Sequence, residues 1–379
     1  EPVVPEVVEP VVSEVVEPEE RAFDVYIVHT NDLQGELLSP GIPLSQFATL
    51  LRWGREISDR NLLLDAGNAT SGSDIALLSE GESVALVLDL LAYDAIAPGP
   101  YDWAYGKDRL LDAARYATEL SSLEVLSANI LDASGMHLFK PYALFDLDGF
   151  VVGVIGIGEV PEDIDGVSSL DEIVIQQAQA LVDEVAASAD YVIVLGNVGT
   201  LHTISSEEIA RAIDGIDLII GGTALDAPSE GVMVGNTLLV SAGARLSSIG
   251  IVEVSVVGDS SSSYATRIDQ HDVAQPHLSS LAQAFGITTI ERDGEMQRFI
   301  DEVASTLPAP VVQEPVVTEP EVVEAVVPEV IEPEERAFDV YIVHTNDLQG
   351  ELLSPGIPLS QFATLLRWGR EISDRNLLL

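Results

Sequence analysis

Short apolar runs alternate along the chain with longer stretches of helical periodicity. Phe23–Val28 has the pattern of a buried strand, and Leu44–Ile57 has the spacing of an amphipathic helix. Further strands are expected at 61–65, 95–97, 124–130, 142–147, 150–157, 191–195, 218–220, 237–242 and 248–257. Further helices are expected at 82–93, 107–120, 170–188, 206–212 and 296–307, and a low-complexity GDSSSS turn at 258–263. Strands that alternate with helices predict an α/β fold.

Polar and glycine-rich loops follow five of the predicted strands. They are HTNDLQG (29–35), DAGN (65–68), GPYD (99–102), LGNVG (195–199) and GGTALD (221–226). Ligands of α/β proteins bind at the carboxyl ends of the strands, so these loops form the expected ligand edge.

The first of these loops lies in a segment that occurs twice. Residues 17–64 return unchanged as residues 332–379, and the second copy stops inside an apolar run. This repetition indicates a window cut from a tandem array. We expect a domain at 21–307 and the truncated start of the next repeat at 336–379. That start would be completed by following residues of the same protein or, in an assembly of separate chains, inserted into a neighbouring subunit.

Two segments rich in Val, Pro and Glu, residues 1–20 and 308–335, flank the domain. Their prolines exclude a continuous helix, so both are expected to be extended. A solvated spacer is one interpretation. The abundance of valine favours docking instead, with Val3–Val16 and Val316–Ile331 contacting neighbouring repeats or subunits.

The amino-acid composition argues against several classes of function. The formal net charge of −46 opposes binding to nucleic acid or to an anionic membrane. The chain has no cysteine, which excludes disulfides and thiolate sites. No apolar run is long enough to cross a membrane, so any anchor or targeting signal is expected outside this window.

The five loops, in this order and with these strands, resemble the catalytic domain of 5′-nucleotidase-type calcineurin-like metallophosphoesterases. HTND followed by DAG carries the resemblance, which covers about residues 22–260. It implies a four-layer α/β/β/α sandwich and, in active members, two metal ions held by the loops. Such members also carry a separate C-terminal nucleoside-binding domain, which is not expected in the roughly fifty residues between Val257 and the second Val-rich segment.

When the family's metal-ligand positions are compared with this sequence, only one of them carries a charged residue. Asp32 matches the first aspartate of the pattern. The other positions carry neutral or non-coordinating residues, namely Gln34, Asn68, Pro100, Tyr101, Asn197, Thr223 and Leu225. Neutral amides are weak metal ligands, so no cofactor and no metal-dependent hydrolysis are expected.

Other candidate residues have a structural and a functional interpretation. Asp32, Asp65 and Asp102 could together hold one cation, although loop aspartates more often shape turns. His29 and its copy His344 are expected to support the loop. His202, just after the Asn197 loop, could be a displaced ligand, although a solvent-facing loop histidine is the simpler interpretation, and His271 and His277 carry no site signal. Gly67, Gly72 and Gly99 are read as turn glycines, because no P-loop pattern accompanies them. Trp53, Trp103, Tyr101 and Tyr105 could form a stacking platform or fill a vacated cleft.

These observations lead to a non-catalytic structural repeat of an extracellular or cell-surface fibre. Two alternatives remain open. One is a cell-surface module that binds a carbohydrate or a nucleotide, and the other is an active phosphoesterase with an atypical site.

Overall fold

A computed structural model describes residues 22–38, 41–169, 171–199, 204–222, 228–258, 260–276 and 289–306, together with two short strands near the C-terminus. The chain divides into two units, residues 1–311 and residues 312–379, and each is described by itself. Both Val-rich segments, and the docking expected of Val3–Val16 and Val316–Ile331, lie outside the described residues. No helix in the described ranges is long and apolar enough to span a bilayer.

The first sheet of the large unit is built around the strand that leads into HTNDLQG. Its order is β14 (Ser260–Asp269), β13 (Ser248–Val257), β1 (Ala22–Thr30), β2 (Asn61–Asp65), β3 (Ala95–Ile96) and β4 (Glu124–Val125). Strands β1 to β4 run parallel, and β13 and β14 are antiparallel to their neighbours. The loops after β1, β2 and β3 therefore leave the sheet at the same edge.

The second sheet has the same arrangement of parallel strands at its centre. Its order is β11 (Val232–Val234), β12 (Thr237–Val240), β10 (Leu218–Gly221), β9 (Tyr191–Gly196), β7 (Val151–Ile157) and β6 (Tyr142–Asp146). Strands β7, β9, β10 and β12 are parallel, so the loops after β9 and β10 also emerge at one edge.

The two sheets pack face to face, and the alternation of side chains along each strand explains why. Ile27 and Leu64 of the first sheet share one buried cluster with Val154 and Ile193 of the second. Neighbouring residues on the same strands point the other way and meet helices, because successive side chains of a strand alternate between faces. Strands β2, β9 and β10 are therefore buried on both sides, as expected for parallel strands covered by helices.

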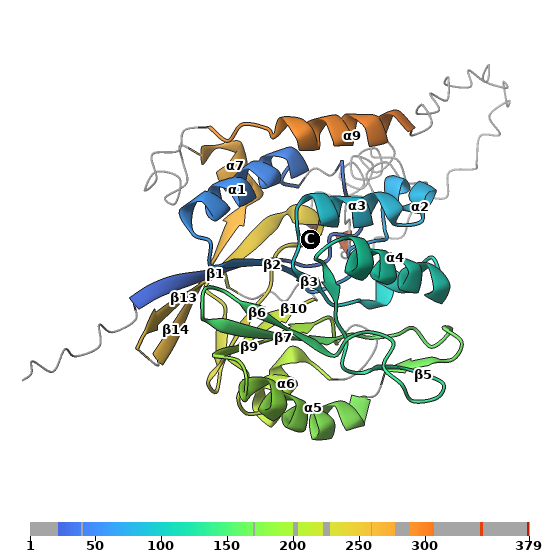
Figure 1. Cartoon of the computed structure of the whole chain (residues 1–379). Helices are drawn as coiled ribbons and strands as arrows, with labels where there is room; N and C mark the ends of the chain where they lie inside the picture. The colour runs from blue at the N-terminus through green and yellow to red at the C-terminus, as the bar shows by residue number, and fades with distance from the viewer. Residues whose placement is uncertain are drawn as a thin grey trace, which may run out of the picture. The chain divides into compact units, whose positions relative to one another are not determined.

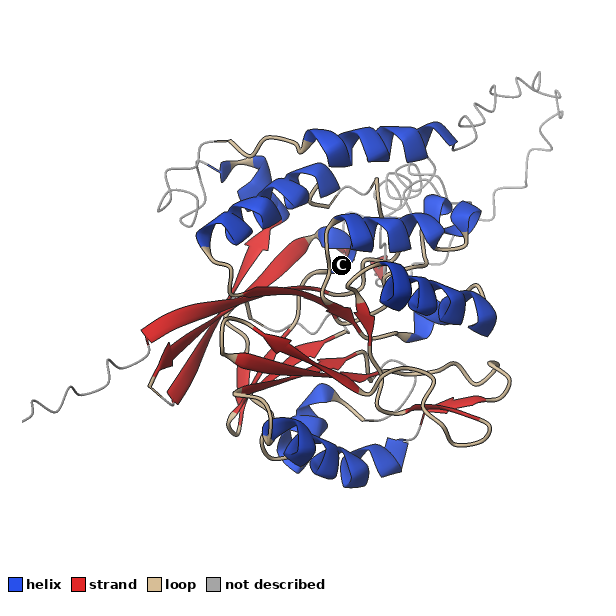
Figure 2. Ribbon diagram, viewed as in Figure 1, coloured by secondary structure: helices blue, strands red, loops and turns tan. Residues whose placement is uncertain are grey.

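Helices form the two outer layers (Figures 1 and 2). The first sheet is covered through one apolar cluster by helices α1 (Leu44–Ile57), α2 (Asp74–Ser79), α3 (Glu82–Leu90), α4 (Lys107–Leu120), α7 (Gln270–Ala274) and α9 (Gly294–Thr306). The second sheet is covered by α5 (Asp171–Ala186) and α6 (Ser206–Ala212). The expected four-layer α/β/β/α sandwich is confirmed.

Two local predictions are wrong. The strand expected at 124–130 ends at Val125, and the chain resumes as β5 (Ile130–Asp132), which pairs with β8 (Val167–Ser169). The serine run expected to be a turn begins β14, which pairs with β13 along its whole length. Backbone pairing with β13 does not require apolar side chains, and most of the serines lie on an exposed part of this edge strand.

In the second unit, β15 (Ile342–Val343) pairs with β16 (Leu377–Leu378) in parallel. The register joins Ile342 to Leu377, which are the repeat equivalents of the paired residues Ile27 and Leu62. The repeated segment thus forms the same strand pairing in both units. The wider tandem array remains a prediction.

Candidate functional site

Loops from the two sheets meet at the edge where the parallel strands end. Asn31, directly after β1, receives a hydrogen bond at Oδ1 from the backbone amide of Ala242, at 2.6 Å. Its Nδ2 lies 3.5 Å from the carbonyl oxygen of Gly222, after β10. The HTND loop therefore connects the first sheet to the second.

Asp32 lies at the centre of this edge and is 5% exposed. Its two carboxylate oxygens accept hydrogen bonds from Nδ2 of Asn68 at 2.9 Å and Nδ2 of Asn31 at 3.0 Å. Asn68 Nδ2 also lies 3.3 Å from Oδ1 of Asn197, which is fully buried. Three of the predicted site residues, Asp32, Asn68 and Asn197, are thus brought together.

Asp102 holds two of the loops to each other and does not join Asp32. Its carboxylate accepts hydrogen bonds from the backbone amides of Asn68, Thr70 and Gly99 and from the Thr70 hydroxyl, all at 2.8 Å. Burial raises the pKa of Asp102, and these hydrogen bonds oppose the rise. Asp102 therefore shapes turns, which was the structural interpretation of the loop aspartates.

Asp65 at the end of β2 is fully buried, and its carboxyl group makes only local hydrogen bonds among those described. It accepts a hydrogen bond from the Thr30 hydroxyl at 2.5 Å and another from the backbone amide of Gly67 at 2.7 Å. Burial raises the pKa of Asp65 well above its ordinary value, which disfavours the charged form that a cation would need.

His29 supports the loop from inside the fold. It is 1% exposed, and its ring lies against Gly250 of β13, where an added Cβ would be 2.0 Å from Nε2. Burial, with a smaller contribution from the positive charge of Arg267, lowers the pKa of His29 to about 3. The imidazole is therefore neutral and structural, as expected from the sequence.

The remaining predicted positions are dispersed. Pro100 is buried in the short helix η1 (Pro100–Trp103), and the Tyr101 side chain is 49% exposed while its amide donates to Asn68 Oδ1 at 2.8 Å. Several positions, namely Thr223, Leu225, His202, His277 and His344, lie outside the described residues. For His271 only the backbone, at the start of α7, is described.

The aromatic residues do not form a common platform. Trp103 is buried against Phe139 with ring centroids 6.3 Å apart, whereas Trp53 packs in the cluster under the outer helices. Tyr105 lies beside Gly81. The space between the loops is filled by Asn197 rather than by aromatic bulk.

Two functional candidates were missed because no motif near them signals a site. Arg245, in η2 (Ala244–Leu246), donates from Nε to Oε1 of Gln34 at 2.9 Å, and its backbone amide donates to the carbonyl of Asp32. Glu159 is buried and accepts from the amide of Gly199, which holds the loop after β9. Only tertiary packing brings these residues to the edge.

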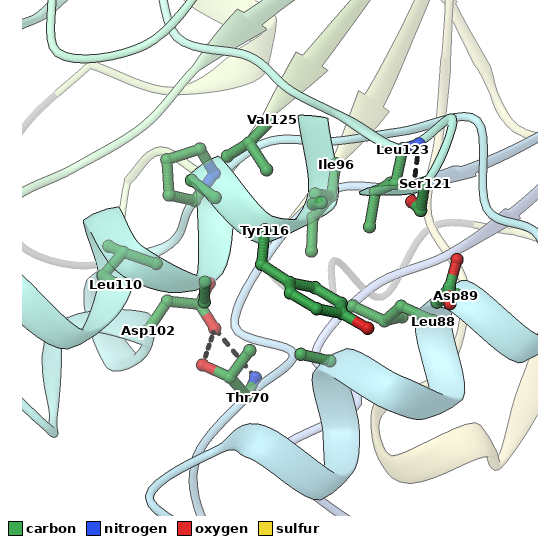
Figure 3. A pocket seen from close by; sticks show the side chains of 15 residues that line it. Thr70, Leu88, Asp89, Ile96, Asp102, Leu110, Tyr116, Ser121, Leu123 and Val125 are labelled. Carbon is green, nitrogen blue, oxygen red and sulfur yellow. Dashed lines mark hydrogen bonds between the residues drawn. The ribbon is translucent and has the colours of Figure 1, made fainter. Parts of the chain in front are cut away.

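Figure 3 shows a cavity beside this edge, between α3 and α4. Its volume is about 50 Å³, and apolar side chains such as Leu88, Leu110 and Leu123 line it around the Thr70–Asp102 hydrogen bonds. This space suits a few water molecules and is far smaller than a nucleotide site.

The described residues of this edge do not fit the two metal ions that the sequence resemblance implies. Within the part of the chain that the structure describes, no group of three or more His, Cys, Asp or Glu side chains is arranged to hold a cation. At the centre of the edge, both oxygens of Asp32 face amide donors, and a donor N–H repels a cation.

The curated proteins that resemble this chain in sequence include several 5′-nucleotidases. No model of a known protein family matches the chain. A probable 5′-nucleotidase of Treponema pallidum is 27% identical over 223 residues, which cover 53% of this chain and 36% of that protein. The 5′-nucleotidase of Diplobatis ommata is 30% identical over 239 residues, or 56% of this chain and 40% of that protein.

Solved structures agree in fold. The 5′-nucleotidase precursor of Thermus thermophilus has a TM-score of 0.59 and 23% identity, and the match covers 75% of this chain and 59% of that one. This chain thus spans less than two thirds of each of these relatives.

The expectation of a non-catalytic structural repeat, and of a chain that is not an enzyme, is wrong. Several curated relatives are named as 5′-nucleotidases or as a nucleotide phosphoesterase, which points to catalysis. That expectation rested on the loss of ligand side chains from the loops, on the repeated segment, on the acidic composition and on the Val-rich segments. The loop motifs do not include residues that tertiary contacts bring to the edge, among them Arg245.

Proposed function

We propose that this chain, which shares the fold of the 5′-nucleotidases and other calcineurin-like phosphoesterases, hydrolyses phosphate esters of the nucleotide class at the HTND edge. The substrate class comes from the names of its relatives. The reaction class is supported by the strained backbone conformations at this edge.

Backbone strain at the edge is the observation that carries the proposal. Non-glycine residues with positive φ are uncommon, and each costs free energy that the surrounding structure must offset. Eight occur in the described ranges, and five of them are at or beside this edge, namely Asp32, Gln34, Asn68, Arg245 and Leu246. Strain of this kind concentrates at functional sites.

Arg245 supplies the positive charge that a phosphate needs. Its side chain is 39% exposed, and Gln34 fixes the guanidinium through Nε. A guanidinium can bind phosphate oxygens through two parallel N–H donors. Oε1 of Glu36 lies 3.8 Å from Nη1 of Arg245 and moderates this charge.

Asp32 acts as the base in this proposal. Amides of Asn31 and Asn68 orient its carboxylate, which takes a proton from the attacking water. The water oxygen bonds to phosphorus, the ester P–O bond breaks, and the leaving alkoxide takes up the proton from Asp32. The products are inorganic phosphate and the free alcohol.

Release of inorganic phosphate from AMP, and hydrolysis of a generic nitrophenyl phosphodiester, test the proposal. We expect Asp32→Asn to lower kcat by about 100-fold or more, the usual contribution of a general base. Arg245→Gln should mainly raise KM, while Arg298→Gln on the exposed face of α9 should change neither. Phosphate release at the rate of the buffer blank, even when AMP binds, would refute hydrolysis.

We also propose an extracellular or cell-surface location and contacts between neighbouring repeats through Val3–Val16 and Val316–Ile331. One structural relative is a precursor form, which supports export. Protease treatment of intact cells tests the location, since digestion of the protein is expected without lysis. Cleavage of the Val-rich segments in the native protein as fast as in free peptides would contradict docking.

A further inference from the structure

The hydrogen bonds between Asp32, Asn68 and Asn197 form one buried chain across both sheets. Asn197 Oδ1 lies 3.3 Å from Asn68 Nδ2, and the same Nδ2 donates to Asp32 at 2.9 Å. The opposite end of the Asn68 amide accepts from the backbone of Tyr101. Asn68 and Asn197 are 2% and 0% exposed, so solvent does not compete with these bonds.

Glycines from three loops close around Asn197. An added Cβ at Gly222 would lie 2.2 Å from its Nδ2, and one at Gly99 would lie 2.7 Å from its Cγ. A Cβ at Gly67 would be 3.1 Å from Nδ2. Loops after β2, β3 and β10 thus pack against one amide, and this amide fills the space between them.

We infer that this amide network does the structural work that a metal pair would do in this fold: it cross-links the loops of the two sheets without a cation. A cation holds loops together by attracting oxygen ligands from each of them. Here a carboxylate, two amides and three close-packed glycines make the same connections through hydrogen bonds and contact. This role is independent of whether the chain hydrolyses phosphate esters.

The test is thermal unfolding of the whole chain in 0.5 M NaCl, which screens cation binding to its acidic surface. We expect the Tm of the wild type to agree within about 1 °C between 1 mM EDTA and 1 mM Mn²⁺ or Zn²⁺. Asn197→Ala should lower the Tm by about 4 °C or more in both solutions, since a lost buried hydrogen bond and a cavity together destabilise the fold. Asn236→Ala, in an exposed turn, is the matched control and should not change the Tm.

A second variant keeps the inference testable if Asn197→Ala does not fold. Asn68→Asp places a carboxylate against Asp32, and like charges at this distance repel. We expect a lower Tm in EDTA that Mn²⁺ or Zn²⁺ partly restores, so that a cation requirement is created. A wild-type Tm that rises by more than about 3 °C with these cations, or one metal ion per chain after dialysis, would overturn the inference. So would an Asn197→Ala protein as stable as the wild type.

Discussion

Protonation of His29 should limit the stability of the fold in mild acid. The pKa of His29 is about 3 in the folded protein, because burial disfavours the imidazolium, and an unfolded histidine has a pKa near 6.5. The unfolded chain therefore binds the proton more tightly. The stability that the neutral His29 contributes to the folded state is complete above pH 6.5 and is lost as the pH falls from 6.5 towards 3.

The size of this loss follows from the shift in pKa. Each pH unit inside the window changes the free energy of unfolding by about 1.4 kcal/mol. At pH 5 the folded His29 is still neutral while the unfolded one is almost fully charged. The folded state should then be about 2 kcal/mol less stable than at pH 8 through His29 alone.

Urea unfolding at pH 5 and pH 8 measures this difference, with His29→Gln as the variant that cannot titrate. We expect the variant to be less stable at pH 8 but to lose about 2 kcal/mol less than the wild type on going to pH 5. His137→Gln, at an exposed position, is the matched control and should keep the wild-type dependence. Equal losses in the wild type and His29→Gln would refute a buried neutral imidazole.

Two further predictions concern neighbours of the same edge. Burial raises the folded pKa of Asp65 above its unfolded value, so its contribution to stability is present in acid and lost as the pH rises through the folded pKa. Asp65→Asn should therefore lose less stability than the wild type between pH 5 and pH 9, and an equally steep decline in urea midpoints would contradict this. Gly250→Ala should destabilise by about 2 kcal/mol or more, because its Cβ would meet the buried His29 ring. Gly258→Ala, where space is open but φ is positive, is a control for strain alone and should cost about 1 kcal/mol.

Much of the fold could be predicted from the sequence because the apolar pattern matches the layers. Helices Leu44–Ile57, Lys107–Leu120 and Ser206–Ala212 have the predicted bounds. Their apolar faces contact one sheet only, which gives a clear helical period. Strand β14 has no such pattern, because it begins with three exposed serines and backbone pairing with β13 defines it.

The candidate site was only partly predictable for a different reason. Loop motifs identified Asp32, Asn68 and Asn197 one at a time, but their hydrogen-bonded chain depends on how two sheets bring separate loops together. Arg245 follows Ala244 in an ordinary stretch of sequence and contacts Gln34 only in the folded protein. Sequence spacing carries no information about contacts of this kind between distant loops.

The backbone conformation at the HTND edge indicates a functional site, although the side chains of the ligand pattern do not. Positive φ at Gln34 and Arg245 costs stability, and glycine at either position would remove that cost. Glycine at Arg245 would also remove the guanidinium, and glycine at Gln34 would remove the acceptor that fixes it. The strained conformation and the fixed positive charge therefore come together. An edge that served only to connect repeats would need neither, and this is the physical reason to seek chemistry at a site whose ligand pattern alone suggests none.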